Sequence, residues 1–433
     1  MKRYSILLCA VLPTAAWFAS TSTDLASAGF MLWQHEIITA IGLTAYLMFT
    51  ICMVLATRPA WLEQRIGGLD KGYLLHKWMG ITGAILVFGH WMLEIVPKAM
   101  VKAGWLARPS HGPRPAQALD FLREPAVHLG EWAAYVMLAL AVIALIKWVP
   151  YHWFRRLHKV FPAAFLVATF HGLILLPQAA WLTPAGLLLA VCALVGSAAS
   201  VFALFGRIGE RHQHEAVISS VTQLSGNVIE IECRVSGKGL SHRPGQFVFA
   251  HFAGNRDPHP FTIASSGSDP RRIRFCVKAL GDDSRAMLHR LRADTPVTVE
   301  GPYGCFDFSA SSGEQVWIGA GIGVTPFLAR LEKLAEAGSA GQPVTFYYCA
   351  PADNPFTHRV RALCERAGVR LHLIDAERDG LLDLDKVVKP LRQIGSSHLW
   401  FCGPSSFGDQ LERAWRGMGL AARNFHREHF AMR

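Results

Sequence analysis

The chain has 433 residues, enough for two or three domains. Hydrophobic residues make up 51% and charged residues 17%, with a net charge of +11. The basic residues flank apolar segments instead of forming a basic helix or stripe, which excludes a nucleic-acid partner and favours membrane lipid. The nine cysteines include no C-x-x-C pair, so they indicate reduced thiols instead of a disulfide framework or a zinc site.

The first half of the chain is a series of apolar segments. Residues 4–19 follow Lys2 and Arg3. They are either a transmembrane helix or a signal peptide, since Ala26-Ser27-Ala28 resembles a cleavage site. Five later segments reach or nearly reach the roughly 20 residues that a membrane span needs. These five are residues 37–56, 74–96, 127–149, 160–177 and 181–205.

Four histidines bracket two of these segments. His76 and His90 are fourteen residues apart, which is about 21 Å along a helix and about 40° short of four full turns. Both imidazoles therefore face one side of the helix. His158 and His171 are thirteen residues apart and about 140° out of phase in an ideal helix. They share a side only if Pro162 bends the helix between them.

Ionisable side chains inside a membrane indicate function, because burying them in hydrocarbon is costly. A single histidine of this kind would more often be a packing residue, but four in two pairs favour haem ligation. Two neutral imidazoles give a six-coordinate haem iron. The two segments cross the membrane in the same direction, so we expect His76 with His158 at an inner haem b. By the same argument, His90 and His171 hold an outer haem b.

The pattern changes after Phe205. Short β-patterned runs, typical of a small antiparallel barrel, occur at residues 216–224, 227–235, 246–253, 259–265, 273–279 and 296–300. Beyond about residue 314, strands alternate with helix-like runs, which predicts a parallel doubly wound sheet. Its expected strands are residues 316–319, 344–349, 370–375 and 398–402.

Three motifs in the barrel region carry binding chemistry. Arg243-Pro-Gly-Gln-Phe247 is a turn that leads into a strand, and His259-Pro-Phe-Thr-Ile-Ala-Ser265 lines up a hydroxyl and apolar neighbours along an extended backbone. Such a backbone suits a flat aromatic ring. Lys278-Ala-Leu-Gly-Asp-Asp-Ser284 supplies a cation, a flexible glycine and a hydroxyl for a pyrophosphate.

A glycine-rich loop follows the first strand of the expected parallel sheet. Gly319-Ala-Gly-Ile-Gly-Val-Thr-Pro326 lets the backbone approach a phosphate, with Thr325 expected to cap the next helix and Pro326 in its first turn. The loop lacks a glycine at position 324, so it does not match G-x-G-x-x-G. Phe401-Cys-Gly-Pro404, at the end of a later strand, strengthens the assignment.

Together, His259-Pro-Phe-Thr262, the loop at 319–326 and Cys402-Gly-Pro404, behind a helical region with two histidine pairs, resemble the ferric reductase / NADPH oxidase superfamily. The resemblance covers the chain from about residue 37 to its end. It implies that FAD is bound by Arg243, Gln246, Phe247, His259, Pro260, Phe261, Thr262, Ser265, Lys278, Gly281 and Ser284. It implies that NADPH or NADH is bound by Gly319, Gly321, Gly323, Thr325, Pro326, Cys402, Gly403 and Pro404.

The resemblance also implies catalytic roles for Thr262, Cys402 and Phe430. An aromatic residue near the C-terminus of such proteins covers the flavin where nicotinamide docks, and Phe430 matches it although three residues follow. Where NADPH-selective relatives carry an arginine, this chain has Cys349-Ala-Pro-Ala-Asp353, so Arg359 or Arg361 would have to bind the 2′-phosphate. Glu94 lies one turn beyond His90, and its carboxylate would favour a cationic electron acceptor.

We therefore expect a multi-domain fold: an α-helical transmembrane bundle, an antiparallel β-barrel FAD domain and an α/β dinucleotide-binding domain of ferredoxin reductase type. The expected domains are residues 1–206, with 1–28 as first helix or signal, 207–308 and 309–433. The expected protein is a multi-pass inner-membrane oxidoreductase that passes electrons from cytoplasmic NAD(P)H through FAD and two haems to oxygen or ferric iron outside. The alternatives are a membrane-anchored flavin reductase without haem and a haem-bearing structural subunit or sensor.

Expected topology rests on the basic residues of short loops. Starting outside at Gly29, five crossings place Arg207 inside, and the loops that carry Arg58, Lys71 and Lys147 agree with the positive-inside rule. The loop at 97–126 is basic and would lie outside, against that rule. We keep this topology because a nicotinamide-dependent domain must meet cytoplasmic cofactor.

Overall fold

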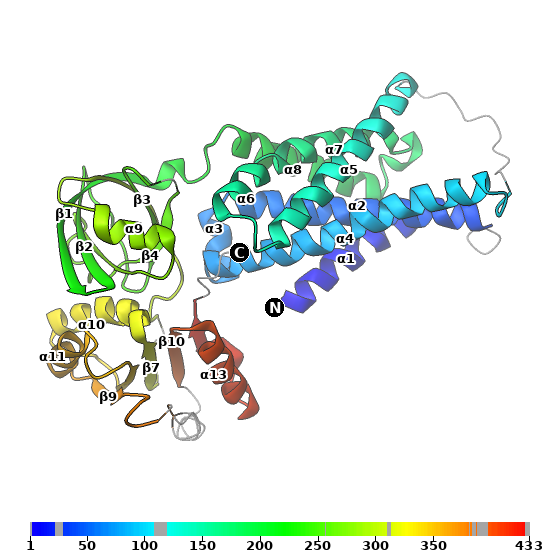
Figure 1. Cartoon of the computed structure of the whole chain (residues 1–433). Helices are drawn as coiled ribbons and strands as arrows, with labels where there is room; N and C mark the ends of the chain where they lie inside the picture. Colours follow the sequence, from blue (N-terminus) through cyan, green and yellow to red (C-terminus); the bar gives the residue numbers. More distant parts are fainter. Residues whose placement is uncertain are drawn as a thin grey trace. The chain divides into compact units, whose positions relative to one another are not determined.

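The computed structural model describes residues 2–21, 29–107, 119–255, 257–309, 313–380, 382, 387 and 397–428. It divides into two compact units (Figure 1). The first comprises Met1–Leu62 and Gly72–Ile208, and the second comprises Glu63–Lys71 and Gly209–Met432. The chain thus passes from the helical unit to the unit of sheets after Ile208, two residues beyond the boundary expected from composition.

The first unit is helical. Its helices are α1 (Lys2–Phe18), α2 (Phe30–Ala56), α3 (Ala60–Ile66, whose last residues belong to the second unit), α4 (Leu69–Lys102), α5 (Arg123–Leu145), α6 (Tyr151–His158), α7 (Phe161–Leu175) and α8 (Pro184–Leu204). Within the described residues, five helical stretches are long and apolar enough to cross a membrane. They are Phe30–Ala56, Leu69–Lys102, Asp120–Leu145, Tyr151–Leu175 and Pro184–Leu204. The five predicted spans are confirmed.

Helix α1 packs into the bundle. The indole N–H of Trp17 donates to the buried carboxylate of Glu36 in α2 at 2.8 Å, and the backbone N–H of Ala185 in α8 donates to the Ser20 hydroxyl at 3.1 Å. Trp17 is itself buried in the bundle core. Helix α1 therefore contacts α2 and α8, and the choice between a transmembrane helix and a signal peptide stays open.

The helix between His158 and His171 is interrupted, as the histidine spacing required. Helix α6 ends at His158, and α7 begins at Phe161 with Pro162 in its first turn. Proline has no N–H to donate to the carbonyl four residues earlier, and its ring clashes with that carbonyl. The carbonyl in question belongs to His158, so the break falls at the histidine.

The second unit begins with a six-stranded antiparallel sheet. Its strands are β1 (Gln213–Ser225), β2 (Val228–Val235), β3 (Phe247–Phe252), β4 (His259–Thr262), β5 (Arg272–Lys278) and β6 (Pro296–Tyr303), in the order β4-β3-β6-β1-β2-β5. An antiparallel bridge from Ile263 to Phe275 joins the two edges. The sheet therefore curls into a barrel around fully buried Ile218, Phe252 and Val299. Helix α9 (Asp282–Arg290) was not predicted.

A five-stranded parallel sheet follows. Its strands are β7 (Gln315–Ala320), β8 (Val344–Cys349), β9 (Arg370–Ile374), β10 (His398–Cys402) and β11 (Phe425–Arg427), in the order β11-β10-β7-β8-β9. The helices around it are α10 (Thr325–Ala337), α11 (Thr357–Ala367) and α13 (Ser405–Gly417). The four predicted strands are present, and β11 adds a fifth. The fold class expected from the sequence is confirmed.

Aromatic packing joins the barrel to the parallel sheet. Phe306 and Phe308 leave β6 and insert against the buried indole of Trp400, with ring centroids 5.0 Å from it in both cases. Phe308 also lies 5.0 Å from Trp317. Large buried aromatic pairs contribute beyond their area, so this cluster fixes the barrel against the middle of β7 and β10.

Candidate functional site

The structure brings the four histidines together in two pairs. The ring centroids of His76 and His158 lie 6.1 Å apart, and those of His90 and His171 lie 6.4 Å apart. Imidazole nitrogens bind metals at about 2 Å, so two rings on opposite sides of one ion have centroids roughly 6 Å apart. Each pair therefore has the spacing of two ligands that share a metal, and the pairs are those expected from the direction of the helices.

Three of the four imidazoles are held through Nδ1. His76 Nδ1 lies 3.1 Å from the carbonyl of Cys52, His90 Nδ1 lies 2.9 Å from that of Ile38, and His171 Nδ1 lies 2.9 Å from that of Ala126. A carbonyl only accepts, so Nδ1 carries a proton in each ring, and in a neutral imidazole the lone pair is then on Nε2. Metal-binding histidines are oriented by such a second contact.

Within the described residues, no group of three or more His, Cys, Asp or Glu side chains is placed to hold a metal. Each histidine pair is thus a set of two nitrogen donors. A haem held by two imidazoles would take only two donors from the protein, since its own ring supplies four nitrogens. The donor set fits haem better than a bare ion.

Glu94 forms an ion pair with Lys98, one turn further along α4. From the sequence, the Glu94 carboxylate was expected to favour a cationic acceptor. Both side chains are substantially exposed. The Lys98 charge offsets the carboxylate near His90, so this position gives no preference between oxygen and ferric iron.

Several of the residues expected to bind FAD lie on β3, on β4 and in the turn before β3. Thr262 in β4 pairs with Phe247 in β3, and β4 is an edge strand. Arg243 forms an ion pair with Asp307 at 2.8 Å, and the Gln246 side chain accepts from the Arg243 backbone N–H at 2.8 Å. The turn before β3 is therefore closed by its own side chains.

The remaining FAD residues occupy different environments. The Phe247 ring is buried in an aromatic cluster with Phe249 and Tyr303. His259, Pro260 and Phe261 are half-buried along β4, and Ser265 is buried just beyond it. Phe247 thus supports the strand from below, whereas the β4 side chains remain accessible on its surface.

Lys278 ends β5, and Gly281 precedes α9. The Ser284 hydroxyl accepts from the backbone N–H groups of Leu280 and Gly281, both at 2.9 Å. This hydroxyl therefore organises the start of α9. Its expected contact with a pyrophosphate stays a prediction.

The two dinucleotide motifs meet in space. Cys402 at the end of β10 pairs with Gly319 at the end of β7. A Cβ on Gly323 would lie 2.3 Å from the Cys402 carbonyl oxygen, and one on Gly403 would lie 2.8 Å from the Ala320 Cβ. Only glycine permits this approach of the two loops. Gly321 has φ +56°, which also favours glycine.

Helix α10 begins differently from the expectation. Thr325 is its first residue, with Val324 at the N-cap position, and the Thr325 hydroxyl donates to the Ile322 carbonyl at 2.7 Å. Pro326 lies in the first turn, as predicted. Thr325 thus fastens the glycine-rich loop instead of capping the helix. Pro404, at the start of α13, is exposed.

A buried carboxyl group near Cys402 was missed by the sequence argument. Burial raises the pKa of the Cys402 thiol, and the carboxyl of Glu428 raises it further, so the sulfur stays a neutral thiol. Both carboxyl oxygens of Glu428 are buried and lack a hydrogen-bond partner among the described residues. Its neighbour in the expected motif, Phe430, lies outside the described residues. A lone glutamate close to the C-terminus gives no sequence signal of burial.

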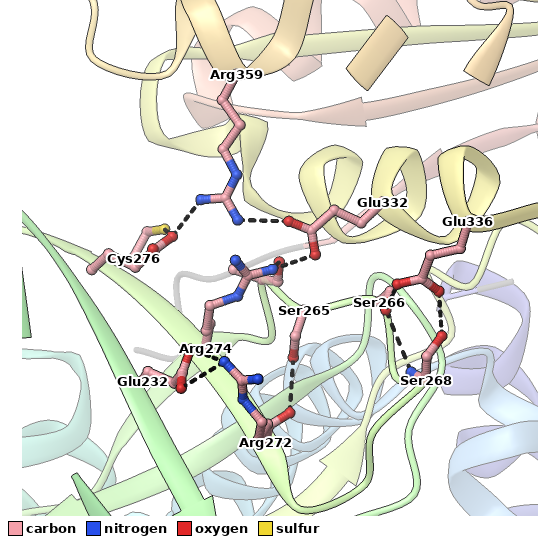
Figure 2. A network of polar contacts seen from close by, with 12 residues as sticks. Glu232, Ser265, Ser266, Ser268, Arg272, Arg274, Cys276, Glu332, Glu336 and Arg359 are labelled. Carbon is pink, nitrogen blue, oxygen red and sulfur yellow. Dashed lines mark hydrogen bonds and ion pairs between the residues drawn. The ribbon is translucent and has the colours of Figure 1, made fainter. Parts of the chain in front are cut away.

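Arg359, one candidate for a 2′-phosphate ligand, is engaged elsewhere. Its guanidinium binds Glu230 in β2 at 2.5 Å and Glu332 in α10 at 2.6 Å. Figure 2 shows Glu332 between Arg359 and Arg274 of β5, with which it also pairs. Arg359 therefore ties the barrel to the α/β sheet, whereas Arg361 is exposed.

Comparison with known proteins finds two family models along the chain. Residues 41–169 match a ferric reductase like transmembrane component, and residues 214–306 match an FAD-binding domain. The first match spans the segments that carry His76, His90 and His158, and it ends two residues before His171. The second spans β1 to β6.

Relatives match parts of the chain. The haem-dependent oxidative N-demethylase beta subunit of Ectopseudomonas mendocina is 27% identical over 43% of this chain and 59% of its own length. Mouse NADPH oxidase 1 is 32% identical over 34% of this chain and 27% of its own. The chain thus spans less than two thirds of either relative.

Among solved structures, the flavohemoglobin from Malassezia yamatoensis has the same fold over much of the chain. It superposes with a TM-score of 0.51 and 15% identity, covering 92% of this chain and 97% of that one. At this level of identity the likeness concerns the fold alone, and it supports the order of a helical part, a barrel and a parallel sheet.

Proposed function

We propose that this chain, a membrane flavin oxidoreductase of the ferric reductase and NADPH oxidase type, passes electrons from NAD(P)H to an acceptor across the membrane. The observation that carries the proposal is the pairing of four histidines, at 6.1 and 6.4 Å, inside a helical bundle followed by an FAD-binding domain. FAD accepts a hydride as an electron pair and releases single electrons, which is the form that haem iron takes up.

In this proposal each histidine pair holds one haem b. His76 and His158 bind the inner haem, and His90 and His171 bind the outer one. Their shared helix, α4, sets the distance between the two sites at about 21 Å along its axis. With two histidines each, the sites would hold haem for electron transfer and not for binding a substrate. The acceptor, oxygen or ferric iron, then receives electrons at the far surface.

The second unit supplies the electrons. The β4 residues from His259 to Thr262, which are all half-buried, would line the flavin. The loops at 319–326 and 402–404 hold the nicotinamide nucleotide, since both sit at the carboxyl ends of adjacent parallel strands. Cys402 would contribute a neutral thiol next to the nicotinamide nucleotide. The role expected of Phe430, covering the flavin, remains part of the proposal. In this proposal both nucleotide sites lie on the cytoplasmic side of the inner membrane.

An absorbance spectrum of the purified chain tests the proposal. A bis-imidazole haem gives an intense Soret band, and this band should shift when NADPH or NADH is added without oxygen. Flavin bands alone would overturn the proposal in favour of a haem-free flavin reductase. A haem-bearing structural subunit or sensor would instead be supported by two observations together. The Soret band would respond to neither nucleotide, and NAD(P)H would not be consumed with any artificial acceptor.

His90→Ala isolates the outer site. We expect the haem-to-FAD ratio to fall by about half, because one of two ligand pairs is lost, while reduction of the flavin by NAD(P)H continues. Acceptor reduction should be lost. His35→Ala is the matched control, since His35 is an exposed histidine in α2. Unchanged haem content in His90→Ala would contradict the assignment.

The acceptor is assigned by turnover measurements on the wild-type chain. Cytochrome c reduction that superoxide dismutase fully suppresses identifies oxygen as the acceptor. Reduction of chelated Fe(III) without oxygen identifies ferric iron.

A further inference from the structure

The two outer histidines, His90 and His171, contact their neighbouring helices in the same way. His90 Nδ1 bonds the carbonyl of Ile38 in α2, and four residues later the helix has Gly42. His171 Nδ1 bonds the carbonyl of Ala126 in α5, and four residues later that helix has Gly130. Residues four apart lie on the same face of a helix. Each imidazole therefore lies over a carbonyl and a glycine one turn apart.

The glycines leave space that no other residue would leave. A Cβ on Gly130 would lie 2.0 Å from His171 Nδ1 and 2.5 Å from its Cγ. A Cβ on Gly42 would lie 3.1 Å from both Nδ1 and Cε1 of His90. A helical carbonyl already accepts its own intrahelical bond, and its second lone pair is reachable only by a group pressed close to the helix surface. The bare glycine makes that approach possible.

The inner pair is held differently. His76 Nδ1 bonds the Cys52 carbonyl at 3.1 Å, and Ala56 stands four residues beyond it. The buried Nδ1 of His158 has no hydrogen-bond partner among the described residues. In the outer pair, each histidine thus contacts a carbonyl and a glycine of a neighbouring helix. In the inner pair, only His76 has such a carbonyl contact, and no glycine lies one turn beyond it.

We propose that Gly42 and Gly130 are positioning residues for the outer site. Each clears the surface of its helix so that the histidine can donate Nδ1–H to the carbonyl one turn earlier. That bond fixes the ring plane and aims Nε2 into the space that the two histidines share. The inference rests on the proposed function, because it takes His90 and His171 to be haem ligands.

Alanine substitutions test the inference in a graded series. Gly130→Ala should displace the His171 ring and remove about one haem of two, halving the haem-to-FAD ratio in a pyridine haemochrome assay. Gly42→Ala requires a shift of only a few tenths of an ångström. It should keep both haems but move the low-spin electron paramagnetic resonance signal and the midpoint potential of one of them. The potential should rise, because weakening the bond to Nδ1–H makes the imidazole a poorer electron donor.

Two glycines adjacent to the same histidines serve as matched controls. A Cβ on Gly89 would meet nothing within 4 Å, and one on Gly172 would make an ordinary 3.6 Å contact with Leu189. Gly89→Ala and Gly172→Ala should leave haem content, spectrum and potential unchanged. A purely structural effect of extra volume in α4 or α7 would appear in these controls as well.

The outcomes separate this inference from the proposed function. If wild type contains no haem, the proposed function fails. If wild type contains two haems and Gly130→Ala keeps both with unaltered resonance and potential, only the positioning role fails. If Gly130→Ala does not fold, Gly42→Ala decides, and an unchanged resonance and potential in that variant overturn the inference.

Discussion

Glu428 is a carboxyl group enclosed in the second unit without a compensating hydrogen bond among the described residues. Burial raises its pKa well above the usual value, and the carboxylates of Asp70 and Glu63 act in the same direction against Lys71. A Cβ on Gly304 would lie 2.7 Å from one of its oxygens, and the φ of +100° at this position favours glycine. The folded state therefore holds a proton that the unfolded state releases near its ordinary pKa of 4.5.

This residue makes stability depend on pH in a definite direction. The folded state binds the additional proton, so stability is full below the unfolded pKa and is lost as pH rises toward the folded pKa. Over that window the loss is about 1.4 kcal/mol per pH unit. Glu428→Gln should remove this loss, so the variant should gain thermal stability over wild type as pH rises above 4.5.

Thermal unfolding followed by circular dichroism at several pH values provides the measurement. The two proteins should converge near pH 4.5 and diverge above it. Glu365→Gln, at an exposed position in α11, is the control and should follow wild type throughout. Parallel curves for Glu428→Gln and wild type would show that Glu428 is ionised in the folded protein.

At the residue scale, the sequence predicts the roles of side chains whose spacing matches the repeat of a helix. His76 and His90 lie on one helical face because fourteen residues make nearly four full turns of one helix. Gly42, Gly130 and Glu428 have no such signature, because their roles depend on which segment packs against them. A glycine in an apolar helix reads as ordinary close packing, and that reading holds for Gly83, whose Cβ would lie 2.9 Å from the Phe49 ring.

At the scale of elements, the break between α6 and α7 determines where His158 points. The chain turns at Lys159 and Val160, between the end of α6 and the start of α7. We expect Pro162→Ala to restore the N–H that a continuous helix would donate to the His158 carbonyl. A continuous helix would leave His158 and His171 about 140° out of phase.

The expected result of Pro162→Ala is therefore loss of the inner haem, with the haem-to-FAD ratio falling toward half. The outer haem should keep its resonance signal, because His171 stays in α7. Pro184→Ala is the matched control, since Pro184 also begins a membrane helix but has no ligand four residues before it. Retention of both haems in Pro162→Ala would mean that packing alone holds the break.

Elements with long apolar runs or strong alternation were predictable, and short ones were not. The five spans and the longer strands bury continuous apolar surface, so their pattern is visible in the sequence. Strand β11 has three residues and α9 has nine. Their positions come from pairing with β10 and from the Ser284 hydroxyl at the helix start, which local composition does not indicate.

At the scale of the second unit, a polar network spans the barrel and the α/β sheet. Arg359 of α11 and Arg274 of β5 share Glu332 of α10, and Arg359 also binds Glu230 of β2. The Ser266 hydroxyl donates to Glu336 at 2.7 Å nearby (Figure 2). The side chains of Arg359 and its two glutamates are between 16% and 26% exposed, so water screens these pairs only in part. The network orients one nucleotide domain against the other.

This arrangement predicts that Arg359 contributes to stability and not to the choice between NADPH and NADH. Arg359→Gln should lower the free energy of unfolding by about 1–3 kcal/mol, since hydrogen bonds to charged groups are lost and two carboxylates remain together. The deficit should shrink in high salt, which screens their repulsion. The ratio of kcat/KM for NADPH to that for NADH should stay unchanged.

Arg361→Gln is the matched comparison, because Arg361 is exposed on the same helix. A fall in that ratio in Arg361→Gln alone would assign the 2′-phosphate to Arg361. A fall in Arg359→Gln with unaltered stability would contradict the structural role of the network.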